Sequence, residues 1–296
     1  MSEYKLFPGC VIQNRVPFLE ASAKYVFDKL GVAYSSGEFG CCPNPVGIKM
    51  ADKKTWCALA ARNIAEAEKE EKPIMALCNG CYQSLAVGNH ELKHDPVLKK
   101  DINAILKKVD KEYKGIIDIN HFVTVLVEEV GLDKIKSMIT NPLEGLKVGV
   151  HPGCHYARPS HILNNEDPMD PHYLKDLVEV AGAEVVDYDL EMLCCGNSVR
   201  NQDEYTANTM LRDKIRAAKE SGADCLAVNC PACFQQFENN QLKLRKMKDA
   251  DKKEKFRFPT LFITEILALA MGKDAKEIGI RYHRNKSREF LNKVSN

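Results

Sequence analysis

Short apolar runs alternate along this chain with longer segments in which apolar positions recur at helical spacing. The clearest short runs cover residues 4–7, 74–77, 148–150 and 226–228. Helical spacing is clearest at residues 16–30, 51–71, 173–181 and 204–221. Because strands that alternate with helices usually form a parallel sheet with helices on both faces, the pattern predicts an α/β fold.

No apolar run approaches the roughly 18 residues that a membrane-spanning helix needs. The best candidate, residues 261–271, is too short and carries Thr264 and Glu265. The mean hydropathy of -0.32 points the same way. A secretory signal is also not expected, because Pro8, Gly9 and Cys10 interrupt the start of the chain. We therefore expect a cytoplasmic protein without membrane insertion.

Charge is balanced, with 42 Lys and Arg residues against 41 Asp and Glu residues. A net charge of +1 gives no reason to expect nucleic acid or an anionic membrane as a partner. The segment 243–257 is locally dense in Lys and Arg with acidic residues interspersed. Such a mixed run is usually a solvated face, and a docking surface for another protein of a complex is the alternative.

Ten of the twelve cysteines form two copies of one pattern, a single Cys, a Cys-Cys pair and a Cys-x-x-Cys. The first copy is Cys10, Cys41, Cys42, Cys78 and Cys81. The second copy is Cys154, Cys194, Cys195, Cys230 and Cys233. Each copy offers five thiols, which is one more than a tetrahedral zinc site or an ordinary cubane iron-sulfur cluster uses.

The residues around the cysteines are duplicated as well. Pro-Gly precedes the first thiol of both copies, an Asn follows the Cys-Cys pair by two residues, and an aromatic-Gln dipeptide follows the last thiol. The offset between copies is 144 residues at the first thiol and 152 at the Cys-x-x-Cys. This drift has the size of loop insertions, so we expect two tandem duplicated domains, 1–140 and 141–296, related by a pseudo-twofold axis.

The predicted strands end immediately before the thiols, and predicted helices follow them. In open parallel sheets, ligands gather beyond the carboxyl ends of the strands. The two remaining cysteines fall outside the pattern: Cys57 lies in an Ala-rich helical segment and Cys225 near a predicted strand. We interpret both as buried, inert core thiols.

Three kinds of chemistry fit paired thiols in an intracellular protein. Any four thiols of one copy would make a structural zinc site, and a Cys-x-x-Cys at a strand-helix junction is also typical of a thioredoxin-like redox pair. Neither explains five thiols with the same neighbours, nor two adjacent thiols, whose side chains diverge in an extended strand. A polynuclear iron-sulfur cluster is therefore the leading interpretation.

This duplicated Cys, Cys-Cys, Cys-x-x-Cys pattern resembles the CCG domain, and over essentially the whole chain it is similar to the B subunits of the heterodisulfide reductases of methanogenic archaea. The resemblance implies a noncubane [4Fe-4S] cluster in each half, held by the five cysteines of that half. It also implies an oxidoreductase of methanogenesis that cleaves the disulfide of coenzyme M and coenzyme B between the clusters. One departure is that Pro43 follows the first Cys-Cys pair, where the second copy has Gly196. We therefore expect the surroundings of the two clusters to differ.

The same resemblance implies residues for the substrate, whose sulfonate, phosphate and carboxylate groups need cations. The candidates near the thiols are Arg15, Lys49, Arg158 and Arg200. His155 follows a ligand thiol and is the candidate that protonates a departing thiolate. Each of these five could instead be an ordinary surface or packing residue.

The chain lacks the Cys-x-x-Cys-x-x-Cys run of ferredoxin domains, so its electrons must come from another protein. The family implies two partner proteins of the reductase, a ferredoxin-like C subunit and a flavin-containing A subunit, with an associated hydrogenase or formate dehydrogenase. No flavin is expected on this chain itself. An electron-relay component of another redox complex, or a zinc-stabilised one, is the alternative.

Overall fold

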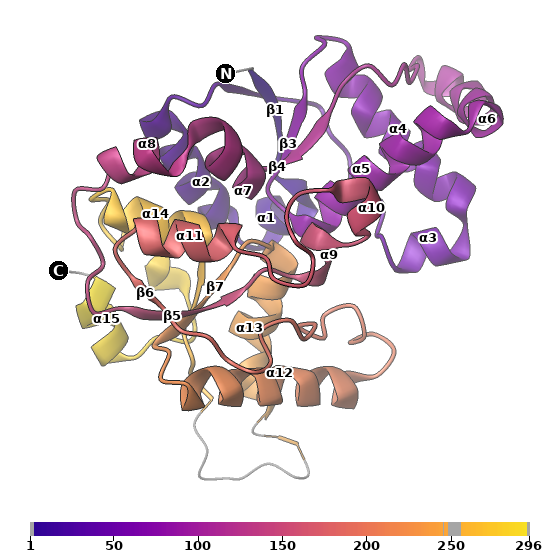
Figure 1. Ribbon diagram of the computed structural model, residues 1–296. Coiled ribbons are helices and arrows are strands. Elements are labelled where there is room, and N and C mark those ends of the chain that lie inside the picture. The colour runs from indigo at the N-terminus through magenta and orange to yellow at the C-terminus, as the bar shows by residue number, and fades with distance from the viewer. Residues whose placement is uncertain (1–2, 245, 248–255, 295–296) are drawn as a thin grey trace.

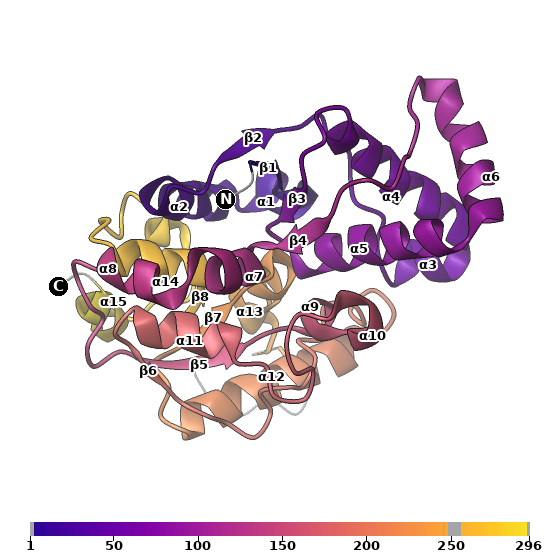
Figure 2. The same cartoon turned by 45° about the horizontal axis from the view of Figure 1, so that its top comes forward.

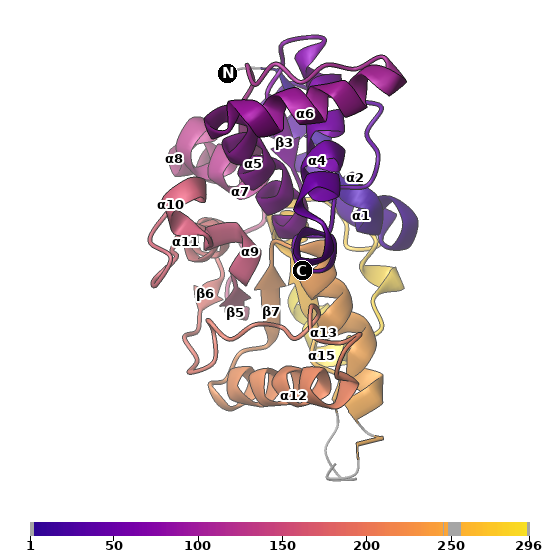
Figure 3. The ribbon, with the colours of Figure 1, turned by 90° about the vertical axis from the view of Figure 1, so that its right-hand side faces the viewer.

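A computed structural model describes residues 3–244, 246–247 and 256–294. It contains two four-stranded sheets, one in each half of the chain, and every strand pair in both is parallel. The first half lies above most of the second in Figure 1, and the turned views of Figures 2 and 3 show the same arrangement, with α14 of the second half against the first half in Figures 1 and 2. The predicted α/β class with two tandem parallel sheets is confirmed.

The first sheet has the order β2-β1-β3-β4. Its strands are β1 (Tyr4–Phe7), β2 (Tyr34–Ser36), β3 (Ile74–Ala76) and β4 (Ile119–His121). Its helices are α1 (Gly9–Arg15), α2 (Pro17–Leu30), α3 (Gly47–Ala51), α4 (Lys53–Glu68), α5 (Asn79–His94), α6 (Pro96–Leu106), α7 (Phe122–Thr124) and α8 (Leu132–Ser137). A short turn η1 (Lys107–Val109) follows α6, and a π-helical stretch η2 (Val125–Val130) continues α7.

The second sheet has the same order, β6-β5-β7-β8. Its strands are β5 (Lys147–His151), β6 (Glu184–Val185), β7 (Cys225–Val228) and β8 (Thr260–Phe262). Its helices are α9 (Cys154–Ala157), α10 (Ser160–Leu163), α11 (Tyr173–Val180), α12 (Glu204–Glu220), α13 (Pro231–Leu244), α14 (Ile263–Ala270) and α15 (Arg288–Val294), with a turn η3 (Ile280–Tyr282). The shared strand order agrees with the duplication.

Central strands are buried on both faces, which is why they read as continuous apolar runs rather than as an alternating pattern. All four residues of β1 and of β7 are buried. The predicted strands 4–7, 74–77, 148–150 and 226–228 therefore agree with β1, β3, β5 and β7 within one residue at each end. The four edge strands β2, β4, β6 and β8 were not predicted: each has only two or three residues, and β2 and β6 are also partly exposed.

Local capping chemistry sets several helix boundaries. The carboxylate of Asp52 accepts the backbone N–H of Thr55, and the carboxylate of Asp203 accepts that of Thr206, which begins α4 and α12 at equivalent places. The predicted helix 51–71 therefore begins at Lys53, because Asp52 is the N-cap residue and has an extended backbone. Helix α2 begins with Pro17 and ends at Leu30, before the C-cap residue Gly31, whose φ of +70° lies in the left-handed region that favours glycine.

Helices of the second half pack directly on helices of the first. Helix α14 of the second half packs on α2 of the first, and α11 of the second half packs on α7 and α8 of the first. The hydroxyls of Ser22 on α2 and Thr264 on α14 lie 2.7 Å apart in this buried contact. Every residue of α14 is buried, so a single core joins the two sheets.

No helix within the described residues is long and apolar enough to cross a membrane. The charged segment 243–257 lies in part outside the described residues. Among its basic residues that are described, Lys243 pairs with Glu204 on the surface of α12, as a solvated charge would.

Candidate functional site

The cysteines lie where strand order reverses in each sheet. Strands β1 and β3 are neighbours, and the chain leaves them in opposite directions to build the rest of the sheet. Ligands of open parallel sheets bind at such a switch point, beyond the carboxyl ends of the strands. Cys10 lies in the first turn after β1, and Cys78 is the N-cap residue of α5 after β3.

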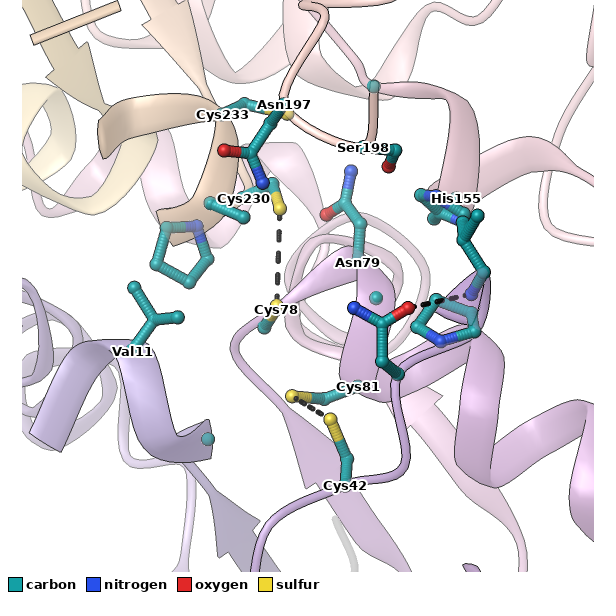
Figure 4. A pocket seen from close by; sticks show the side chains of 18 of the residues that line it. Val11, Cys42, Cys78, Asn79, Cys81, His155, Asn197, Ser198, Cys230 and Cys233 are labelled. Carbon is teal, nitrogen blue, oxygen red and sulfur yellow. Dashed lines mark hydrogen bonds between the residues drawn. The ribbon is translucent and has the colours of Figure 1, made fainter. Parts of the chain in front are cut away.

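One cavity brings both cysteine sets together. Its volume is about 210 Å³, and all ten cysteines of the two copies line it. Figure 4 shows sulfurs from both halves facing this space, with Cys78 opposite Cys230. The duplicated thiols of the two halves therefore surround one space, as cleavage of a substrate between two clusters would require, and we call this space the cysteine cavity.

In the first half, Cys42 and Cys81 place their Sγ atoms 3.0 Å apart, and Cys41 and Cys10 place theirs 3.8 Å apart. Cys42, Cys78 and Cys81 are buried, whereas Cys10 and Cys41 are exposed. The thiol of Cys41 donates to Cys42, which raises the pKa of Cys41 and lowers the pKa of Cys42. The adjacent pair therefore contains one thiol that ionises easily.

The second half repeats this arrangement with a different turn. The Sγ atoms of Cys195 and Cys233 lie 3.3 Å apart, and the backbone N–H of Gly196 donates to Cys194 Sγ at 3.4 Å. Hydrogen bonds from Cys154, Cys195 and Gly196 lower the pKa of Cys194 to about 2. Gly196 has a φ of +84°, which proline cannot adopt, so the equivalent turn at Pro43 must differ.

The halves meet at their equivalent Cys-x-x-Cys motifs. Cys78 Sγ and Cys230 Sγ, which correspond to each other in the duplication, are 3.9 Å apart. The amide of Asn79 donates to the carbonyl oxygen of Pro152 at 2.8 Å and to Asn229 Oδ1 at 3.1 Å. The two halves therefore meet in the cysteine cavity through one pair of equivalent thiols, Cys78 and Cys230.

Two equivalent glycines leave room for the sulfurs. Gly9 and Gly153 both have a φ of +78°, and each precedes the first cysteine of its half. A Cβ atom at Gly9 would lie 2.7 Å from Cys81 Sγ, and one at Gly153 would lie 2.5 Å from Asn79 Nδ2. The Pro-Gly-Cys motif therefore brings backbone close to the side chains that surround the cysteine cavity, as glycine permits.

The donor set fits polynuclear iron-sulfur chemistry. All twelve cysteines are free, so no disulfide competes for the ten in the cavity. Five converging thiols in each half exceed the four ligands of a tetrahedral zinc ion. The helix that begins at each Cys-x-x-Cys turns its N-terminal N–H groups toward the sulfurs, which stabilises thiolates. The two cysteines outside the pattern, Cys57 and Cys225, are fully buried in the core.

His155 lines the cysteine cavity, and its Nδ1 lies 2.6 Å from Gln83 Oε1. An amide oxygen only accepts, so Nδ1 carries the proton. Gln83 in turn donates to the carbonyl oxygen of Arg158 at 2.6 Å. Burial lowers the pKa of His155 despite the opposing charges of Cys230 and Cys194. His155 is thus held at the cavity by a residue of the other half.

The four predicted cations do not converge on the cysteine cavity, since none of them is among its lining residues. Arg15 lines a separate groove, Lys49 lies 4.8 Å above the ring of Trp56, and Arg158 donates to the carbonyl oxygen of Pro168. Arg200 is half-buried in the turn before α12. A substrate-binding role for each stays a prediction.

Sequence reasoning missed a groove between α1 and α13 of about 610 Å³. Arg15, Arg284, Phe18, Phe234 and Tyr282 are among its lining residues. The rings of Phe18 and Tyr282 stack at 6.1 Å. No sequence signal pointed to this groove, because Arg284 and Tyr282 lie far along the chain from Arg15.

Sequence reasoning also missed two buried polar residues behind the second cysteine set, His151 and Lys214. A ring nitrogen of His151 lies within 4.8 Å of Cys195 Sγ and Cys233 Sγ. Lys214 Nζ lies 3.0 Å from His151 Nδ1. Burial lowers the pKa of Lys214 to about 8, and the charges of nearby cysteines oppose this decrease. His151 directly precedes the Pro-Gly-Cys motif, which was the available signal.

Comparison with known proteins assigns this arrangement to a family. A family model described as "CCG: Cysteine-rich domain" matches residues 4–86 and, a second time, residues 148–238. The two matches cover more than half of the chain and all ten patterned cysteines. The chain belongs to the CCG family.

Named relatives place the chain more narrowly within the CCG family. The B subunit of the ferredoxin/F420H2-dependent CoB-CoM heterodisulfide reductase of Methanosarcina acetivorans is 39% identical over 99% of this chain and 97% of its own. The B subunit of the ferredoxin:CoB-CoM heterodisulfide reductase of Methanosarcina mazei is 37% identical over the same shares. The family of heterodisulfide reductase B subunits, inferred from the cysteine pattern, is confirmed.

A crystal structure of a hypothetical protein from Helicobacter pylori has the same fold, with a TM-score of 0.76 and 18% identity. The match covers 97% of this chain and 53% of that one, so this chain spans about half of the longer protein. At this identity the likeness supports the fold alone.

Proposed function

We propose that this chain is the catalytic B subunit of a CoB-CoM heterodisulfide reductase and acts at two noncubane [4Fe-4S] clusters. The observation that carries the proposal is the convergence of ten free thiols, five from each half, on one cavity. In the reaction, two electrons and two protons break the S–S bond of the coenzyme M–coenzyme B disulfide and yield two thiols. Methanosarcina relatives that are similar over nearly the whole chain carry this name.

Each half would hold one cluster. Cys10, Cys41, Cys42, Cys78 and Cys81 would bind the first, and Cys154, Cys194, Cys195, Cys230 and Cys233 the second. When bound, such clusters accept and deliver single electrons, and two of them suit a two-electron cleavage. The chain itself shapes the cavity, buries most of the ligand sulfurs and keeps equivalent thiols of the two halves within 3.9 Å.

The groove between α1 and α13 is a candidate binding path for the part of the substrate that extends beyond its disulfide bond. Val11 and Arg15 lie one turn apart on α1, and Pro231 and Gln235 lie one turn apart on α13. The first residue of each pair lines the cysteine cavity and the second lines the groove. The guanidinium of Arg15 could therefore bind a phosphate or sulfonate that extends from a disulfide in the cavity.

The segment 158–168, which includes α10, packs on α5 beside His155, because Tyr82 donates to Asn165 Oδ1 at 2.8 Å and Gln83 donates to the carbonyl oxygen of Arg158. Arg158 is engaged with Pro168 in this segment, so among the four predicted cations Arg15 has the best geometric support. Lys49 and Arg200 stay candidates on the basis of sequence position alone.

His155 is the proposed proton donor for one departing thiolate. Its ring lies in the cysteine cavity with Nδ1–H donated to Gln83, so a second proton, taken up on Nε2, is the one that the ring would deliver to a substrate sulfur, returning to the neutral form. The position of the imidazole is thus set by both halves.

Electrons are proposed to reach the clusters from separate proteins of the complex. A ferredoxin-like C subunit would deliver them, after reduction by a flavin-containing A subunit and its hydrogenase or formate dehydrogenase. Cys10 and Cys41 are the exposed ligands, so the first cluster would be the more accessible to a donor. We propose a cytoplasmic location for the complex.

Anaerobic purification followed by iron, sulfide and zinc analysis tests the proposal, together with heterodisulfide reduction by a reduced viologen dye. We expect about eight Fe per chain, and about four after Cys81→Ser or Cys233→Ser. Cys57→Ser is the matched control, because Cys57 is buried away from the cavity, and it should retain all the iron. One zinc per half would overturn the cluster assignment. Full iron content without heterodisulfide reduction would instead indicate an electron-relay protein.

A further inference from the structure

A buried pair, His151 and Lys214, lies behind the second cysteine set. His151 ends β5 and is 2% exposed, and Lys214 on α12 is fully buried. A ring nitrogen of His151 lies within 4.8 Å of Cys195 Sγ and Cys233 Sγ. The pair is therefore next to two of the five ligands of the second cluster.

The hydrogen bonds around Lys214 fix the tautomer of His151. Lys214 Nζ lies 2.8 Å from the carbonyl oxygen of Glu191 and 3.0 Å from His151 Nδ1. An ammonium group only donates, so Nδ1 accepts and the ring proton resides on Nε2. Nε2 is buried without a hydrogen-bond partner. A buried N–H donor without a partner is costly, which calls for an acceptor at this position.

The charge of Lys214 also requires a counter-charge. Within the described part of the chain, no carboxylate lies in ion-pair distance of its ammonium, and the carboxylate of nearby Glu191 pairs with Lys175 instead. A buried charge without a partner is strongly unfavourable. Cys195 and Cys233 lie on this side and would be thiolates once they bind a cluster, so the cluster ligands would supply the compensation.

The first half has no such pair. The position equivalent to His151, directly before Pro-Gly-Cys, is Phe7, whose ring packs on Phe39 at 4.8 Å. Counted from the matching helix caps Asp52 and Asp203, Lys214 corresponds to Asn63. Asn63 is neutral and holds the backbone of Gly40 and Cys41. The two halves therefore differ at these two positions next to the cysteines, where only the second half carries His and Lys.

We propose that Lys214 and His151 act as a charge-assisted donor pair, in which the Nε2–H of His151 donates a hydrogen bond to a sulfur of the second cluster and raises its reduction potential above that of the first. A donor and a nearby positive charge stabilise the more negative, reduced form of a cluster. The second cluster would then be reduced first and hold its electron more tightly. Both are positioning residues, since neither touches the space open to substrate.

The inference rests on the proposed clusters, and wild-type iron content tests that foundation separately. The experiment is a redox titration of the iron-loaded chain, followed by electron paramagnetic resonance. Loss of one signal in Cys233→Ser identifies the second cluster. His151→Phe introduces the residue of the other half, and Lys214→Gln keeps a hydrogen-bond donor but removes the charge. Phe7→Leu is the matched control at the equivalent position.

We expect both variants to retain iron and to shift the second cluster to a more negative potential, while Phe7→Leu leaves this potential unchanged. An exchangeable proton coupled to the second cluster, seen by electron-nuclear double resonance after transfer to D2O, should disappear in His151→Phe. Unchanged potentials with full iron would overturn the proposal. Iron loss in His151→Phe, with unchanged potentials in Lys214→Gln, would show that His151 is a ligand instead of a donor. If His151→Phe does not fold, Lys214→Gln alone decides by the same shift.

Discussion

Gly9 and Gly153 show how a single residue type shapes the ligand set. Both precede the first cysteine of a half, both have a positive φ, and neither has space for a Cβ atom. The repeat of Pro-Gly-Cys in the sequence is thus explained by backbone conformation and by contact with the sulfur or amide next to it. A search for cysteines alone would leave these glycines out.

Gly9→Ala should lower iron content by about half, because the new Cβ atom would press on Cys81 Sγ, which lies 2.7 Å away. Backbone strain contributes about 1 kcal/mol in addition. Gly131→Ala is the matched control, since Gly131 also has a positive φ, at +85°, but has nothing within 4 Å of the Cβ position. Equal iron loss in both variants, measured after anaerobic purification, would contradict the steric explanation.

His283 gives a residue-level prediction on pH. Burial disfavours the charge of His283, but the attraction and hydrogen bond of Glu265 and the charge of Glu238 outweigh it and raise its pKa, against a weaker opposing effect of Lys286. Nε2 of His283 lies 2.9 Å from Glu265 Oε1. A raised folded-state pKa means that this stabilisation is complete below the unfolded value of about 6.5 and is lost as the pH rises through the folded value.

His283→Gln should therefore cost about 2 kcal/mol of unfolding free energy at pH 6 and clearly less at pH 9. Anaerobic denaturant unfolding of wild type and variant at the two pH values measures the difference. A cost that is equal at both pH values, or larger at pH 9, would show that the buried pair is neutral.

At the level of elements, the long helices and central strands could be predicted from the sequence because burial on two faces gives a continuous apolar run. Their ends were less accurate where one residue decides the boundary. Asp52 caps the N-terminus of α4, so the helix predicted from residue 51 begins at Lys53, and the same Asp-x-x-Thr motif recurs at Asp203. The short outer strands β2 and β6 gave no such run.

Asp203→Ala should destabilise the protein by about 1 kcal/mol, because the first turn of α12 loses the acceptor for the Thr206 N–H, which lies 3.0 Å from Asp203 Oδ1. Asp203→Asn keeps a capping oxygen and should cost a few tenths of a kcal/mol. Denaturation midpoints at constant m-value provide the measurement. A large loss in Asp203→Asn would assign the effect to charge rather than to capping.

At the scale of the whole molecule, the duplication predicted two halves, but it did not predict that helices α11 and α14 of the second half pack on the first half. Helix α14 is buried in full between the sheets, and the linker is tied to it, because Thr140 and Asn141 donate to the carbonyl oxygen of Ala270 at 3.0 and 2.8 Å. The two sets of cysteines that line one cavity could be picked out from their spacing in the sequence, and their role as cluster ligands stays a prediction. Substrate cations and the groove could not be picked out in this way, since they depend on how distant segments meet.

We expect residues 1–140 and 141–296, produced separately, to be insoluble or unfolded, because each exposes a large apolar face that the other covers. Co-expression of the two pieces should restore a soluble complex with about eight Fe. Size-exclusion chromatography and iron analysis test this. A soluble, monomeric first half that retains four Fe would show that the boundary separates independent domains.

The meeting of buried sulfurs between the halves has a consequence for how the protein matures in the cell. Six ligand cysteines are buried once the halves have closed: Cys42, Cys78, Cys81, Cys195, Cys230 and Cys233. Iron and sulfide delivered afterwards would have to enter past the less buried ligands Cys10, Cys41, Cys154 and Cys194 or from the groove between α1 and α13. Since metal binding is coupled to folding at such sites, cofactor insertion should precede or accompany closure. The proteins that build the clusters would then act on a chain whose two halves have not yet closed, and the completed clusters would help to hold the two halves together.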